Sequence, residues 1–339
     1  MNVCMSTRYF DFRNAGIGRV SSAIADGMEK RGHNVHRIST DRTDLYSYFK
    51  YTFLELKYKI PKGYDVYHAL TPMEGMWTPS QKTVVTFYDL IPLLHLNRTG
   101  SGIGNSKWKR LIGSKAFEMG CKRASKAARI ACISRDTLKD VVKTFDVPYK
   151  KCSVIRLGIR EDLEPAKKPD NVFRIGYLGQ LDRRKRVNML VKVFTESYFN
   201  GELVLAGGGA DEKEVKALAR GDPRIRFLGY LPDDELVDFY NSIDVFAFPT
   251  WVEGYGLPPV EAMACKKPTI VMMDAVMPFD VKSRCILTDD LGLIIGNEKY
   301  LKGRMASIDL EDNYRFAKEH SWDKCLDEYE RLYKEVQSA

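Results

Sequence analysis

The 339-residue chain lacks any apolar run near the roughly 20 residues that a membrane-spanning helix requires. Its N-terminus, MNVCMSTRYF, lacks a basic segment followed by an apolar one, so no signal peptide is expected. The seven cysteines occur singly and form no C-x-x-C pair, which favours reduced thiols in the core of a cytoplasmic protein. The five histidines do not cluster in the sequence, so none is assigned to a metal.

Length and charge indicate the general class of the protein. A chain of 339 residues is typical of two domains, and 44% hydrophobic with 29% charged residues is an ordinary globular balance. The formal charge of +8 is unevenly placed. Residues 1–164 hold 28 basic and 16 acidic residues, whereas residues 165–339 hold 25 basic and 29 acidic residues. This asymmetry indicates an anionic partner for the first half, which on charge alone is a nucleic acid, an anionic lipid or a phosphorylated substrate.

Short apolar runs alternate with amphipathic segments through the first half. Most of these runs lack polar alternation, which is typical of parallel strands covered on both faces. The expected strands are Asn2–Ser6, Val35–Ser39, Asp65–Ala69, Thr83–Phe87, Arg129–Ile133 and Ser153–Arg156. The expected helices are Gly16–Arg31, Asn105–Ser125 and Arg135–Phe145. This order predicts a doubly wound, Rossmann-like α/β domain over residues 1–162.

The pattern starts again after a charged, proline-bearing linker, Arg160–Asn171. The expected strands are Phe173–Leu178, Leu203–Ala206, Ile225–Leu228, Val245–Phe248 and Thr269–Met272. The expected helices are Val187–Tyr198, Glu212–Ala219, Asp233–Asn241, Pro258–Cys265 and a helical tail, Asp309–Gln337. We therefore expect a second Rossmann-like domain over residues 170–318, with ligands between the domains at the carboxyl ends of both sheets.

The most informative segment is Phe246–Pro268, which reads FAFPTWVEGYGLPPVEAMACKKP. A strand is followed by a loop with two glycines and then by a helix that begins near Pro258. Glycines let the backbone approach a ligand, and the N-terminus of a helix attracts anions. Glu253 precedes this helix and Glu261 is expected in its first turn. The amides of the glycine loop suit a phosphate, and the carboxylates of Glu253 and Glu261 suit sugar hydroxyls. In the alternative, the acidic residues only stabilise the first turn of the helix.

Here the sequence resembles the family 4 glycosyltransferases, which have the GT-B fold. Glu253-x7-Glu261 resembles the family signature. The resemblance extends through the second half in family order, at Tyr177–Gly179, Arg184-Lys185, Leu203–Gly209, Phe227–Leu231 and Pro249-Thr250. In the first half it covers Gly16–Arg19, Val85–Pro92 and Ile133-Ser134.

The resemblance implies a role for each matching residue. Glu253 would face the hydroxyls of the donor sugar, and Glu261 would hold the ribose. Arg184 and Lys185 would neutralise the diphosphate leaving group, which fixed cations stabilise as its charge develops. The other implied donor-binding residues are Gly16, Gly179, Gly254, Tyr255, Gly256 and Leu257. On the acceptor side the implied residues are Arg19, Tyr88, Asp89 and Ser134.

The resemblance further implies transfer with retention of configuration and without a cofactor or required metal. The donor would be a nucleotide-diphospho-sugar such as GDP-mannose or UDP-glucose, and the acceptor a saccharide or a lipid-phosphate-linked sugar. The segment from residue 319 to 339 would return to the first domain. Whether Glu253 acts as a nucleophile or only as an electrostatic stabiliser stays open at this point.

Three residues depart from the usual family pattern. Tyr88 stands where many relatives carry His before Asp89, and Gln180 stands where many carry Arg after Gly179. Because of these two departures, the resemblance specifies the donor and the acceptor less closely. Lys266 stands where glycine usually follows the helix of the signature, and a left-handed backbone there would cost about 1 kcal/mol in a lysine.

The segment Asn105–Ala127 combines basic residues with Trp108, Phe117 and other apolar residues. A basic amphipathic helix can lie on an anionic membrane surface, so peripheral membrane contact through the first domain is one hypothesis. In the alternative, the apolar residues face the core and the basic residues face water.

Two other functions are weaker alternatives. A nicotinamide-dependent oxidoreductase would need G-x-G-x-x-G after the first strand, but Gly16-Ile17-Gly18 is followed by Arg19-Val20-Ser21, so the third glycine is missing. A nucleic-acid-binding protein could use the basic first half, but the sequence holds no recognised nucleic-acid module.

Overall fold

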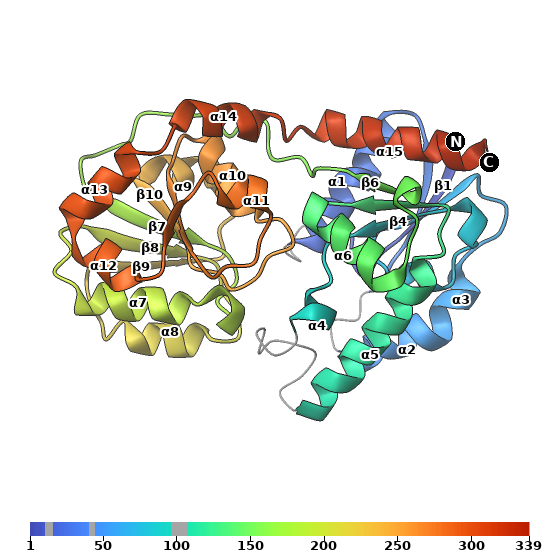
Figure 1. The fold of residues 1–339 in the computed structure, drawn as a ribbon, viewed down its shortest axis with the longest axis horizontal. Helices are drawn as coiled ribbons and strands as arrows, with labels where there is room; N and C mark the ends of the chain where they lie inside the picture. The colour runs from blue at the N-terminus through green and yellow to red at the C-terminus, as the bar shows by residue number, and fades with distance from the viewer. Residues whose placement is uncertain (11–15, 41–44, 96–106, 339) are drawn as a thin grey trace. The chain divides into compact units, whose positions relative to one another are not determined.

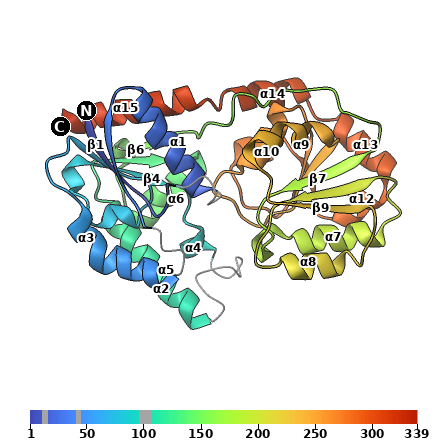
Figure 2. The ribbon, with the colours of Figure 1, turned by 180° about the vertical axis from the view of Figure 1, so that it is seen from behind.

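The computed structural model describes residues 1–10, 16–40, 45–95 and 107–338. The described chain forms two compact units (Figures 1 and 2). Unit 1 consists of the described residues up to Gly158 together with the segment from Ser321 onward. Unit 2 is Ile159–His320. Each unit carries one six-stranded parallel sheet, so the prediction of two doubly wound α/β units is confirmed.

Unit 1 has the sheet order β2-β1-β3-β4-β5-β6. Its strands are β1 Asn2–Ser6, β2 Asn34–Ile38, β3 Val66–Ala69, β4 Thr83–Phe87, β5 Arg129–Cys132 and β6 Cys152–Val154. Its helices are α1 Ile17–Lys30, α2 Leu45–Lys50, α3 Leu56–Lys59, α4 Ile91–Leu94, α5 Lys107–Ala124, α6 Arg135–Phe145 and α15 Trp322–Gln337. Helices α1 and α15 lie on one side of the sheet, and α2, α3 and α5 lie on the other (Figures 1 and 2).

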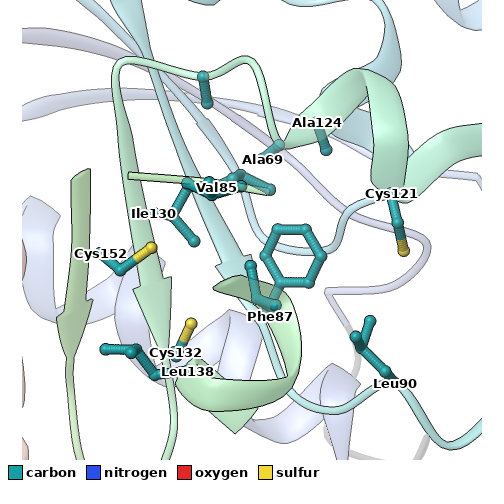
Figure 3. Packing of buried hydrophobic residues seen from close by; sticks show 13 residues of the cluster. Ala69, Val85, Phe87, Leu90, Cys121, Ala124, Ile130, Cys132, Leu138 and Cys152 are labelled. Carbon is teal, nitrogen blue, oxygen red and sulfur yellow. The ribbon is translucent and has the colours of Figure 1, made fainter. Parts of the chain in front are cut away.

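The core of unit 1 lies between this sheet and its helices (Figure 3). Phe87 and Ile130 from neighbouring strands are fully buried there, and Phe117 of α5 packs against them from the helix side. The partly buried Phe117 ring therefore faces the core, as the alternative to membrane contact expects for this residue. All seven cysteines are buried with free thiols, as expected.

The helical tail is two helices rather than one. Helix α14, Leu310–Lys318, belongs to unit 2, whereas α15 belongs to unit 1. The break falls at residues 319–321, where the Ser321 hydroxyl accepts from the Asp323 amide and so begins α15. In unit 1, α15 packs by buried hydrogen bonds, since the Tyr333 hydroxyl meets His68 Nδ1 at 2.6 Å and the Tyr329 hydroxyl meets Thr86 Oγ1 at 2.9 Å.

Unit 2 has the sheet order β12-β11-β10-β7-β8-β9. Its strands are β7 Arg174–Leu178, β8 Glu202–Ala206, β9 Ile225–Gly229, β10 Val245–Phe248, β11 Thr269–Met272 and β12 Ile286–Thr288. Its helices besides α14 are α7 Val187–Glu196, α8 Glu212–Leu218, α9 Leu236–Ser242, α10 Leu257–Ala264, α11 Phe279–Lys282, α12 Leu291–Gly296 and α13 Glu298–Ala306. Helices α7 and α8 cover one face, and α9, α10 and α14 cover the other (Figures 1 and 2).

The strand order places a topological switch point in the middle of unit 2. The chain runs outward from β7 to β8 and β9, and then returns to β10 on the other side of β7. In open parallel sheets, ligands bind outside the carboxyl ends of the strands at such a point. The segments that follow β7 and β10 are therefore the first place to look for a site. Among the described helices, none combines the length and the hydropathy that a bilayer crossing demands.

Candidate active site

One buried carboxylate collects three donors at this switch point. Glu253, in the loop after β10, accepts at Oε1 from Lys185 Nζ at 2.7 Å and from Arg184 Nη1 at 2.7 Å. The Thr250 hydroxyl donates to the same oxygen at 2.6 Å. Burial alone would raise the pKa of Glu253, but the adjacent Lys185 and Arg184 outweigh burial and lower this pKa below its usual value. The site thus holds one ionised carboxylate between two cations.

Lys185 is buried and still supplies one of these cations. Burial lowers the pKa of its ammonium group and the charge of Arg184 lowers it further, whereas Glu253 opposes both. The ammonium lies 4.7 Å from the centre of the Phe248 ring, at the end of β10. A buried ammonium is stable only with such partners, because removing a charge from water is costly.

Backbone contacts fix the loop that carries these cations. The Asp182 carboxylate accepts from the Lys185 amide at 3.0 Å and so begins the 3-10 turn Arg183–Lys185. The Trp251 amide donates to the Arg184 carbonyl at 2.8 Å, and Arg184 Nη1 also donates to the Val252 carbonyl at 2.9 Å. The loops after β7 and β10 are therefore joined by main chain as well as by charge.

The glycine loop continues directly into α10. Gly256 has a φ of 91° and is the N-cap residue of this helix, a conformation that glycine adopts without strain. Among the described residues, no hydrogen bond engages the amides of Gly254 or Gly256. The first amides of a helix also lack intrahelical partners. These donors are available to an anion at the N-terminus of α10, where the helix dipole favours negative charge.

Glu261 lies one turn further along α10 than expected. The helix begins at Leu257 and has no acidic residue in its first turn. The explanation of Glu261 as a first-turn charge is therefore wrong. The side chain is buried and accepts from the Tyr240 hydroxyl of α9 at 2.7 Å. Tyr240 was not identified from the sequence, because its pairing with Glu261 depends on how α9 and α10 pack.

Gly179 and the glycines after β8 pack backbone against backbone. Gly179 has a φ of 153°. A Cβ atom at Gly207 would lie 1.9 Å from the Gly179 carbonyl oxygen, and one at Gly209 would lie 2.5 Å from that of Leu181. Only glycine fits at these two positions, and the close contact holds the start of the Arg184–Lys185 loop in place.

Tyr255 uses its side chain within unit 2. The ring is buried, and its hydroxyl forms a short hydrogen bond with His320 Nε2. His320 Nδ1 in turn lies 3.0 Å from the Phe316 carbonyl oxygen. Only the main chain of Tyr255 is therefore left for a ligand at the glycine loop.

Unit 1 carries Gly16, which is expected to bind the donor, and the residues expected on the acceptor side. Gly16 is the N-cap residue of α1 with a φ of 77°, and a Cβ atom there would meet open space. Arg19 lies in the first turn of α1, and Tyr88 follows β4 with its hydroxyl buried. Asp89 accepts from the Ile91 amide at 2.9 Å.

Ser134 acts as a helix cap. Its Oγ accepts from the Thr137 amide at 3.0 Å and so begins α6, a contact that is typical of a residue at this position.

Comparison with known proteins shows which family this site resembles. Residues 159–278 match the family described as Glycosyl transferases group 1, and they hold every residue expected at the donor site except Gly16. The match covers most of unit 2 and none of unit 1, so this part of the chain is similar to the group 1 glycosyltransferases. A relative, the O-antigen chain mannosyltransferase B of Escherichia coli, is 24% identical over 231 residues, and the match covers 61% of each chain. The O-antigen chain mannosyltransferase RfbU of Salmonella typhimurium is 24% identical over 273 residues, covering 74% of this chain and 71% of RfbU.

Solved structures show that the two units have the GT-B fold. The sucrose-phosphate synthase of Thermosynechococcus elongatus superposes with a TM-score of 0.76 at 18% identity, over 100% of this chain and 99% of that one. The Anabaena protein HepE in complex with UDP-glucose gives a TM-score of 0.73 at 15% identity, over 99% and 100% of the two chains. The dehydrogenase and nucleic-acid alternatives find no support among these relatives.

Proposed function

We propose that this chain is a retaining hexosyltransferase that moves a hexose from a nucleotide-diphospho-sugar to a saccharide or lipid-linked acceptor. The observation that carries the proposal is the buried cluster of Glu253, Arg184 and Lys185 at the switch point of unit 2. Breaking the glycosidic bond of such a donor leaves negative charge on a diphosphate, and two fixed cations stabilise that charge as it develops.

The cluster binds the donor by exchange of partners. Without a donor, Glu253 pairs with both cations, and Asp182 supplies a second negative charge beside Arg184. A diphosphate near Lys185 and Arg184 competes with Glu253 for them, so Glu253 becomes available to the hydroxyls of the donor sugar. Amides of the glycine loop and of the first turn of α10 complete the phosphate site, and Glu261, held by Tyr240, accepts from the ribose hydroxyls.

The identity of the donor is narrowed by the relatives. Two of them are named mannosyltransferases, which favours GDP-mannose, whereas the structure of HepE holds UDP-glucose. We expect transfer to need no metal, with the leaving phosphate receiving the proton of the acceptor hydroxyl. Arg19, Tyr88, Asp89 and Ser134 remain the proposed acceptor-side residues of unit 1.

A panel of nucleotide sugars tests the function directly. GDP-mannose, UDP-glucose, UDP-galactose, NAD and a DNA duplex are each added to the full chain, and thermal unfolding and donor hydrolysis are measured. A ligand at a hundredfold excess over its dissociation constant stabilises the fold by about 2.7 kcal/mol. The proposal is supported if one nucleotide sugar stabilises the chain against thermal unfolding and is itself hydrolysed, with EDTA present. Stabilisation by NAD or DNA alone contradicts it, and strict dependence on Mg²⁺ or Mn²⁺ contradicts the metal-free chemistry.

We also propose that unit 1 touches anionic lipid surfaces through α5, at the cytoplasmic side. The outer face of α5 exposes Leu111, Ile112 and Met119. It also exposes the basic residues Lys115, Lys122 and Arg123, and the exposed Lys126 follows directly after the helix. The side chains of Lys107, Trp108, Lys109 and Arg110, on which part of the sequence-based hypothesis rested, lie outside the described residues. Each Lys or Arg near an anionic surface contributes about 1 kcal/mol, which salt screens over about 8–10 Å.

Liposome binding tests the lipid contact. The triple variant Lys115→Ser, Lys122→Ser and Lys126→Ser should bind vesicles with phosphatidylserine more weakly than wild type at low salt, with donor hydrolysis unchanged. The control removes the same charge from exposed lysines of unit 2: Lys192, Lys213 and Lys299. Two results would exclude a specific role for α5: an equal loss of vesicle binding in both triple variants, or vesicle binding that does not fall with salt.

A further inference from the structure

Arg186 adopts a backbone conformation that costs energy in any residue except glycine. It follows the 3-10 turn Arg183–Lys185 with φ 53° and ψ 30°, in the left-handed region. Long side chains rarely occupy this region, and strained positions of this kind concentrate at functional sites. The charged side chain is also buried.

The guanidinium of Arg186 joins three loops of unit 2. It donates to the Asp274 carboxylate from Nη2 at 2.7 Å and from Nη1 at 3.1 Å. Nη2 also donates to the Thr250 carbonyl at 2.9 Å, and the group lies 5.1 Å from the centre of the Trp251 ring. These partners come from the loops after β10 and β11, whereas Arg186 itself follows β7. The three strands are neighbours in the sheet order β11-β10-β7.

The segment that Arg186 fixes is the one that carries Glu253. Thr250, whose carbonyl receives the Arg186 bond, is the residue whose hydroxyl donates to Glu253. Main-chain bonds continue the connection, because the Val276 amide donates to the Trp251 carbonyl at 2.9 Å and the Glu253 amide donates to the Val276 carbonyl at 2.8 Å. Asp274 already neutralises Arg186 and so distinguishes it from the phosphate-facing cations Arg184 and Lys185.

We propose that Arg186 is a positioning residue for the transfer reaction: its bridge between Asp274 and the Thr250 carbonyl holds Glu253 in the geometry that the donor sugar requires. The strained backbone places the guanidinium where it reaches both loops. This role rests on the proposed function of Glu253. It requires no contact between Arg186 and the donor.

The decisive variant is Arg186→Gly, because glycine removes the guanidinium and relieves the backbone strain at once. Lys266→Gly is the matched control. Lys266 also has a φ of 53°, is cationic, and pairs with Glu311 away from Glu253. Arg186→Lys keeps the charge and the strain but cannot form the two-pronged bridge, so it should give an intermediate result.

Three measurements on the full chain separate positioning from a merely structural role. Urea unfolding should show both glycine variants folded under assay conditions. Turnover of whichever panel nucleotide sugar the wild type hydrolyses should fall at least tenfold in Arg186→Gly and less than twofold in Lys266→Gly, with the dissociation constants of GDP and UDP changed less than threefold. Amide hydrogen exchange should be at least tenfold faster at Trp251 and Glu253 in Arg186→Gly, and unchanged there in Lys266→Gly.

Each outcome decides between the two roles. Unchanged exchange at Trp251 and Glu253 in folded Arg186→Gly overturns the positioning role, whatever the activity. Faster exchange with wild-type turnover also overturns it. A wild type that hydrolyses no nucleotide sugar refutes the proposed function and with it the link to transfer, while exchange still reports whether Arg186 holds this segment.

Discussion

Replacing Glu253 with glutamine separates the two tasks of this carboxylate. In the wild type its Oε1 accepts from Lys185, Arg184 and Thr250. The variant keeps an amide oxygen of the same shape, so Thr250 and one cation retain an acceptor, but the negative charge is lost. Lys185 and Arg184 then keep only the more distant Asp182 carboxylate, 3.9 Å from Arg184, as a counter-charge, and breaking a buried ion pair from one side costs about 3–5 kcal/mol.

The expected loss for Glu253→Gln lies at the lower end of this range, about 3 kcal/mol. Glutamine still hydrogen-bonds, and burial already lowers the pKa of Lys185, so this ammonium can release its proton more readily once Glu253 is neutral. Nucleoside diphosphate binding should behave in the opposite way. The diphosphate no longer competes with a carboxylate for the cations, so the affinity for GDP or UDP should be retained or rise by up to about tenfold, which is 1.4 kcal/mol.

Urea unfolding with and without saturating GDP or UDP measures both effects, and donor turnover is measured alongside. We expect a less stable free protein, larger stabilisation by the nucleotide, and strongly reduced turnover. Glu298→Gln is the control, because Glu298 pairs with Lys302 in an exposed i,i+4 arrangement that contributes about 0.3–0.5 kcal/mol. Parallel losses of stability and nucleotide affinity, or wild-type turnover, would refute the competition between Glu253 and the diphosphate.

Three further predictions follow from single contacts. Lys185→Ala should raise the barrier to transfer by about 2–4 kcal/mol, seen as reduced turnover of bound donor, and unchanged turnover would exclude it from leaving-group stabilisation. Thr250→Val removes one hydrogen bond to Glu253 and should cost about 1 kcal/mol in unfolding free energy, measured in urea against wild type. Burial lowers the pKa of His68 to about 3, below its usual 6.5. The neutral imidazole therefore contributes fully to stability above pH 6.5, and this contribution falls as the pH decreases, with a loss of about 2 kcal/mol at pH 5. His68→Gln should remove this part of the pH dependence of the unfolding free energy.

The sequence predicted the strands well where an apolar run is long and clearly bounded. Strands β1, β4, β10 and β11 begin and end at the expected residues. Strand β12, Ile286–Thr288, was missed because three residues at a sheet edge carry too little pattern. The segment 45–59 was also missed, since it is helical but interrupted by the π-helical stretch Tyr51–Glu55, a geometry that residue spacing does not specify.

The sequence also located the residues of the candidate site but not their pairing. The glycine loop and the Arg184-Lys185 segment were expected at strand ends, and both lie there. One oxygen of Glu253 binds both cations because two loops nearly 70 positions apart approach each other. No local pattern in the sequence encodes this approach. The Arg186–Asp274 bridge was missed for the same reason, because it joins residues 88 positions apart from the loops after β7 and β11.

On the proposed function, the arrangement of charges explains how unit 2 can keep a phosphate site without a ligand. Lys185 is buried and Arg184 is largely shielded from water, so these neighbouring cations repel each other and lose hydration unless negative charge lies beside them. Glu253, with Asp182 beside Arg184, supplies that negative charge while the site is empty, and a diphosphate would supply it on binding. Arg186 does not take part in this exchange, because Asp274 neutralises it separately. The bridge that holds the Thr250–Glu253 segment therefore stays intact while Glu253 changes partners, so the carboxylate can leave the cations without losing its position relative to the donor sugar.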